Sequence, residues 1–165
     1  MSDFYPDLRA DERRTLEQFL EQRRASIRAA LDGLADADAA ARLLPHTEMT
    51  IGGIVKHLAH VEDLWFTHKF AGRDFPAPWP GKEQEWAWRT AAGDSAAELL
   101  AIYEAACERS RAVAAAHASL DDLAALPSFG KGPVGLRWVF VHMIEETAQH
   151  RGHIDLMLDV VRGRG

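Results

Sequence analysis

Cysteine is nearly absent from this sequence: Cys107 is the single example among 165 residues. One thiol excludes an internal disulfide, and a chain without disulfides is expected in a reducing compartment. No apolar run approaches the roughly 20 residues of a membrane-spanning helix. The charged N-terminal segment MSDFYPDLRADERR also lacks the apolar stretch of a secretory signal. We therefore expect a cytoplasmic protein that has no membrane partner.

Basic residues are also few, with 19 lysines and arginines against 25 acidic residues and a formal net charge of -6. The clustered arginines at 13–14 and 23–24 share their segment with several glutamates, so they predict a solvated helix face rather than a basic stripe. Binding to a phosphate backbone requires such a stripe, and we expect no nucleic-acid partner. The sequence also lacks the P-loop, GxGxxG, GxSxG and HExxH motifs.

Strand-like alternation of apolar and polar residues is missing, and a helical period dominates instead. Four long helices are expected, at residues 11–34, 50–70, 95–117 and 133–161, with short helical turns at 39–43 and 82–88. The pattern predicts one all-α domain over residues 1–165, a four-helix bundle with long inter-helix loops that permit crossover connections. We expect the tryptophan-rich loop at 73–89 to fold over one end of the bundle.

The last predicted helix carries a stripe that is apolar at its ends and polar at its centre. With spacings of three and four, the stripe runs through Val139, His142, Glu146, His150, His153, Met157 and Val160. Carboxylates and imidazoles on a core-facing stripe are unfavourable unless they are paired or bind a metal. The centre of this helix is therefore a candidate binding site.

A matching stripe on the helix at 50–70 places His57 between apolar residues. Two facing helices would bring His57 opposite Glu146 and His150, which project from neighbouring turns. Two imidazole nitrogens and one carboxylate oxygen form a common ligand set for zinc with an open position, and they also suit Fe²⁺, Ni²⁺ or Mn²⁺. Three such residues on two core stripes favour a metal site over hydrogen-bonded core histidines.

The other titratable residues carry weaker signals. His60 and His142, taken alone, are typical of hydrogen-bonded packing residues. His153 is open as a ligand, a neighbour that orients a ligand, or a substrate contact, and we favour the neighbour. A catalytic acid or base is not fixed by the pattern, so His153, His142 and His60 all stay candidates. Cys107 is expected to be a small buried apolar residue.

The segments IGGIVKHLAHVEDLWF (51–66) and HMIEETAQHRGHIDLMLDVV (142–161) resemble the DinB-like superfamily of bacterial four-helix proteins, in an actinobacterial branch. The resemblance implies one ligand from the second helix, matched by His57, and two from the fourth, matched by Glu146 and His150. A glutamate at the middle position resembles mycothiol-dependent maleylpyruvate isomerases. His153 departs from the glutamine that the family carries after its RG pair.

The resemblance also implies thiol chemistry. It predicts a metal-dependent S-transferase-like enzyme that uses mycothiol, or a similar low-molecular-weight thiol, on an electrophilic small molecule, with zinc or nickel as the metal. Two alternatives stay open: a non-catalytic metal-binding stress-response module, and a hydrolase that uses metal-activated water. We also expect a homodimer, paired through Ala- and Leu-rich surfaces of the first and third helices.

Overall fold

The computed structural model describes residues 5–82 and 85–163. The long helices are α1 (Glu12–Leu31), α3 (Ile51–Glu62) with its π-helical continuation η1 (Asp63–Phe70), α5 (Ala96–Ala115) and α6 (Leu136–Arg162). The short helices are α2 (Asp36–Ala40), α4 (Trp86–Thr90) and the 3-10 turn η2 (Ala91–Gly93). Outside these helices, the described residues form two isolated β-bridges and no strand. The predicted all-α fold with four long helices is confirmed.

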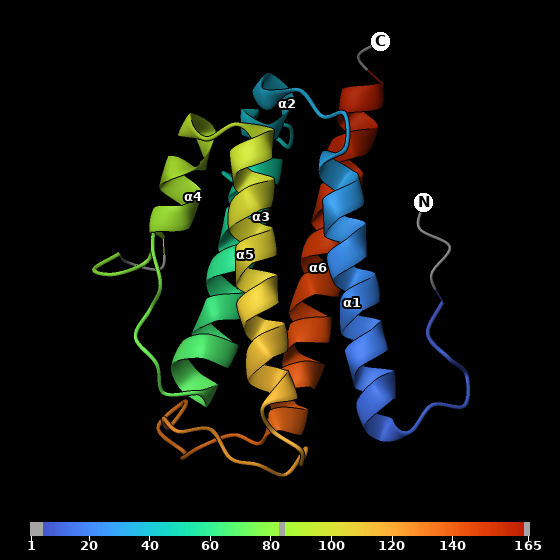
Figure 1. The fold of residues 1–165 in the computed structure, drawn as a ribbon. Coiled ribbons are helices and arrows are strands. Elements are labelled where there is room, and N and C mark those ends of the chain that lie inside the picture. The colour runs from blue at the N-terminus through green and yellow to red at the C-terminus, as the bar shows by residue number, and fades with distance from the viewer. Residues whose placement is uncertain (1–4, 83–84, 164–165) are drawn as a thin grey trace.

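The helices follow an up-down-down-up order, because a long crossover returns the chain between the second and third long helices (Figure 1). The α1 and α6 helices run in parallel, since Arg137 binds Glu12 near their first turns and Arg151 donates to the Ser26 carbonyl about four turns later along both helices. The α3 and α5 helices also run in parallel and form the second closely packed pair.

Local sequence signals explain where the helices begin. The side chains of Asp11 and Thr50 accept hydrogen bonds from backbone N–H groups three residues on, at 2.8 and 2.9 Å. Ser95 and Glu98 form a reciprocal capping box at the start of α5. These caps satisfy N–H groups that have no partner within the helix.

Several predicted helix boundaries differ from the structure by two residues or more. The first helix ends at Leu31 rather than residue 34, since Asp32 is extended and Gly33 has a left-handed φ of +70°. The following short helix begins at Asp36, earlier than predicted, with acidic side chains in its first turn. The last helix begins after Gly135 rather than at Pro133.

The second long helix is not α-helical to its end. From Asp63 to Phe70 it widens into a π-helix, which the apolar pattern did not indicate. Its last two carbonyls, of Lys69 and Phe70, accept hydrogen bonds from Leu126 and Ala125 at 3.0 and 2.9 Å. The segment before α6 therefore holds the end of η1.

The bundle interior holds two apolar clusters, one toward each end. A fully buried ion pair lies where the clusters meet: Arg24 of α1 donates to both carboxylate oxygens of Glu62 at 2.7 and 2.6 Å. Arg24 also binds Glu21 one turn earlier. This network ties α1 to α3 across the core.

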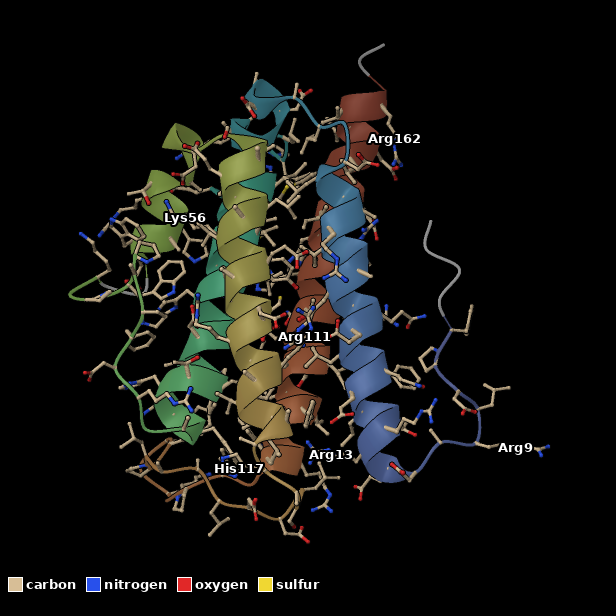
Figure 2. All side chains as sticks on the ribbon, in the orientation of Figure 1. Arg9, Arg13, Lys56, Arg111, His117 and Arg162 are labelled. Carbon is tan, nitrogen blue, oxygen red and sulfur yellow. The ribbon has the colours of Figure 1, made fainter. Side chains whose placement is uncertain are left out.

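The tryptophan-rich segment lies along the flank of α3 rather than over one end of the bundle, so this expectation is wrong (Figure 1). Buried polar partners explain its position. Trp79 donates from Nε1 to the buried Asp63 carboxylate at 2.8 Å, and Lys56 reaches Asp94 at 2.5 Å with its ammonium over the Trp86 ring. Figure 2 shows Lys56 on the side of the bundle where α4 lies. In the described residues, no helix has both the length and the apolar character needed to cross a membrane.

Candidate metal centre

Three side chains from two helices converge at the interface of α3 and α6. His57 Nε2 lies 3.0 Å from Glu146 Oε1, and His150 Nε2 lies 3.3 Å from the same oxygen. One ligand atom from each of the three residues falls within 4.8 Å of the others. The structure therefore brings together the three residues that the sequence pattern selected.

Helix geometry accounts for this convergence. Glu146 and His150 are four residues apart on α6, so they project from adjacent turns of one face. The α3 helix runs antiparallel to α6 and presents His57 from the opposite side. His57 is buried, with 8% of its side chain exposed, whereas Glu146 is 21% exposed. The carboxylate thus lies between a buried imidazole and solvent.

The carboxylate is the electrostatic centre of the cluster. Hydrogen bonds from His150 and then His57 hold the pKa of Glu146 well below its ordinary value, despite partial burial that opposes this shift. Nδ1 of both histidines is buried and has no hydrogen-bond partner among the described residues. An ionised carboxylate between two imidazoles is a donor set that fits a divalent cation of the zinc or nickel type.

An aromatic ring covers one side of this cluster. Trp88 stacks on His57 with ring centroids 4.7 Å apart and an interplanar angle of 26°. The close approach depends on Gly53, where a Cβ atom would lie 3.0 Å from the Trp88 ring. The sequence placed Trp88 in a loop with other packing aromatics. The paired glycines at 52–53, one turn before His57, were the available signal for a ring packed against α3.

The three candidate acid–base histidines have different neighbours in the structure. His153 makes an edge contact with His150 at 5.4 Å, so it lies beside one of the three converging residues. His142 lies one turn before Glu146, and burial lowers its pKa. His60 instead packs against Phe75 and Trp79 at 5.4 and 5.1 Å, and burial lowers its pKa as well. His60 thus belongs to the packing of the tryptophan-rich segment.

A separate cavity of about 470 Å³ lies between α1 and α5 and includes none of the three converging residues. Its two arginines, Arg24 and Arg111, are already paired with Glu62, Glu21 and Glu108. Arg111 lies in the middle of this α1–α5 face in Figure 2. Because its cations are neutralised, the cavity lacks the convergent polar groups that mark the α3–α6 site.

Comparison with known families agrees with this geometry. The profile of the mycothiol-S-transferase family, a DinB-like family, matches residues 15–163, which includes all four long helices except the first residues of α1. The chain belongs to the mycothiol-S-transferase family. The match spans His57, Glu146 and His150, so the converging residues lie within the family's region of similarity.

A solved structure shares the fold of this mycothiol-S-transferase family member. A conserved protein of Enterococcus faecalis superposes with a TM-score of 0.65, covering 94% of this chain and 99% of that protein at 18% sequence identity. Identity this low supports the fold alone. No curated protein is significantly similar to the chain.

Proposed function

We propose that this protein binds one divalent metal ion, zinc or nickel, through His57, Glu146 and His150, and that it transfers a mycothiol-like thiol to an electrophilic small molecule. The observation that carries the proposal is the convergence of two imidazoles on one ionised carboxylate at the α3–α6 interface. Membership of the mycothiol-S-transferase family supports the thiol as co-substrate.

The ion would supply two things at this site: a binding position for sulfur, and a lowered thiol pKa that gives thiolate near neutral pH. With one carboxylate among the three residues, a divalent ion leaves a net positive site that favours an anionic sulfur. In the transfer, the thiolate sulfur forms a bond to the electrophilic carbon. The leaving group departs with its bonding electron pair, and the thiol proton goes to solvent or a nearby base.

Surrounding residues have separate roles in this proposal. Stacking by Trp88 fixes the plane of the His57 ring. His153 orients His150 through its edge contact. His142, one turn from Glu146, is the candidate that accepts the thiol proton.

The protein's own thiol is not the nucleophile in this account. Cys107 is fully buried on α5, and burial together with the Glu62 charge raises the pKa of its thiol. A buried thiol with a raised pKa carries almost no thiolate at neutral pH. The reacting sulfur must therefore come from a co-substrate.

The experiment combines metal-loaded protein, mycothiol and monochlorobimane, and follows the fluorescent thioether. We expect turnover that requires thiol and metal together and that is lost in His57→Ala. His46→Ala removes an exposed histidine far from the cluster in sequence and is the matched control. Release of chloride with formation of hydroxymethyl bimane in the absence of thiol would support the hydrolase instead. Stoichiometric metal without turnover on any thiol would support the non-catalytic module.

A further inference from the structure

A second group of aromatic side chains lies where η1, the continuation of α3, meets α6, below the metal-binding cluster. It consists of Trp65, Phe129, Trp138 and His142, which we call the aromatic patch. The rings contact one another: His142 stacks on Trp138 at 4.9 Å and 15°, and Trp65 meets both rings at 4.8 Å. Phe129 lies 5.7 Å from each tryptophan.

The patch adjoins the candidate metal centre. His142 is one helical turn from Glu146, a rise of about 6 Å, and Trp138 is one turn further. On the facing helix, Trp65 follows His57 by eight residues and contacts His142 across the interface. The patch and the metal-binding cluster therefore adjoin along one side of α6, and His142 is the α6 member of the patch that is nearer to Glu146 in sequence.

The patch is partly open to solvent. Trp65 is buried and forms the floor, while Trp138 is 38% exposed and Phe129 is 69% exposed. Rings that contact one another and reach the surface form a contiguous apolar face, and ligand sites are lined mainly by such aromatic and apolar side chains.

The backbone holds Phe129 in this exposed position at a conformational cost. Phe129 and Gly130 have φ values of +54° and +67°, and the Lys131 N–H donates to the Ser128 carbonyl at 3.0 Å. Both central residues are left-handed, as in a type I′ turn, where asparagine, aspartate or glycine is preferred at the first position. A phenylalanine there is unusual, and such strained residues cluster at functional sites.

The exposed area argues for a small ligand. The exposed parts of Phe129 and Trp138 together offer less than about 300 Å², given 150–250 Å² for a whole aromatic side chain. A stable protein interface needs about 800 Å² from each partner. One flat ring system of a small molecule matches the area that the patch presents.

We propose that the aromatic patch binds the electrophile, and that the electrophile is a planar aromatic compound whose ring packs on Trp138 and Phe129. The inference rests on the proposed function, because the patch lies beside the residues that would hold the thiol sulfur. Binding there would place a reactive carbon attached to the ring between the patch and the metal-binding cluster.

The test compares two electrophiles that differ in their ring systems. Monochlorobimane is planar and bicyclic, whereas iodoacetamide has no ring. With mycothiol, we expect Phe129→Asn to lower kcat/KM for monochlorobimane about tenfold and to change iodoacetamide less than about twofold. Trp138→Ala also removes the ring stacked on His142, so it should lower kcat/KM for both electrophiles, and for monochlorobimane by about tenfold more than for iodoacetamide. Phe129→Asn suits the turn better than the native residue, so it removes the ring without unfolding the loop. Phe19→Ala removes from α1 a ring about as exposed as that of Trp138, and as the control it should change neither electrophile.

A binding measurement separates the two proposals. A non-electrophilic bimane is titrated without thiol or metal, and its fluorescence anisotropy should saturate with the native protein and rise less with both patch variants. If the native protein binds the bimane saturably and the patch variants do not, but the native protein turns over no electrophile, the patch proposal stands and the proposed function is overturned. The patch proposal is overturned if the variants lower kcat/KM equally for both electrophiles, or if they change neither value. It is also overturned if they change the self-association of the protein and leave bimane binding as it is.

Discussion

Replacing Glu62 by leucine tests the buried ion pair that joins α1 to α3. The Glu62 side chain is fully buried, and Arg24 is 3% exposed, so the arginine has little access to water when its partner is removed. Arg24 would lose two of its three carboxylate hydrogen bonds and keep the one to Glu21.

The expected loss follows from these contacts. Removing one partner of a buried pair lowers the free energy of unfolding by about 3–5 kcal/mol because the other charge is no longer fully compensated. Arg24 would keep only Glu21, whose carboxylate Arg111 also binds. For a chain of this length each kcal/mol lowers Tm by about 2–4 °C, so Glu62→Leu should melt about 6–20 °C lower. Replacing both partners, Arg24→Met with Glu62→Leu, removes the stranded charge and should restore most of this loss.

The assay is chemical and thermal unfolding followed by circular dichroism, for both single variants and the double variant. Arg42→Ala removes an exposed ion pair with Glu48 and should leave Tm unchanged, which makes it the surface control. The reasoning fails if Glu62→Leu lowers the unfolding free energy by less than about 1 kcal/mol. It also fails if the double variant loses as much as the two single variants added together.

Three further predictions concern the Cys107 thiol, the stacking of Trp88 on His57, and the oligomeric state. Burial raises the pKa of Cys107, so a thiol reagent should label it only after unfolding, even at about pH 9; rapid labelling of the folded protein would contradict this. Gly53→Ala should push Trp88 from His57 and alter tryptophan emission, whereas Gly152→Ala, whose Cβ meets nothing within 4 Å, should not. Light scattering at micromolar concentration should give twice the chain mass of 18.3 kDa, and the single mass would exclude the predicted homodimer.

The helices and the converging residues were predictable because both depend on spacing along one element. Residues spaced by three or four lie on one face of a helix, so Glu146 and His150 share a face regardless of how the loops fold. His57 could be paired with them because it interrupts an apolar stripe on a helix that must face the core.

Features that depend on contacts between distant segments were not predictable. The π-helix, the Asp63 carboxylate that Arg109 and Trp79 share, and the stacking of Trp88 all need partners from other parts of the chain. The residues next to each of these side chains in sequence do not indicate which distant segment it will contact. The predicted position of the tryptophan-rich segment was wrong for the same reason, because the sequence around Trp79 does not show that its indole N–H donates to the buried Asp63 carboxylate.

The metal content of purified protein tests the central claim most directly. The native chain should carry about one equivalent of zinc or nickel after dialysis, and His57→Ala should carry less than about a tenth, with its helical circular dichroism retained because the apolar clusters remain intact. Stoichiometric metal in folded His57→Ala would contradict the assignment of His57, Glu146 and His150 as the metal ligands.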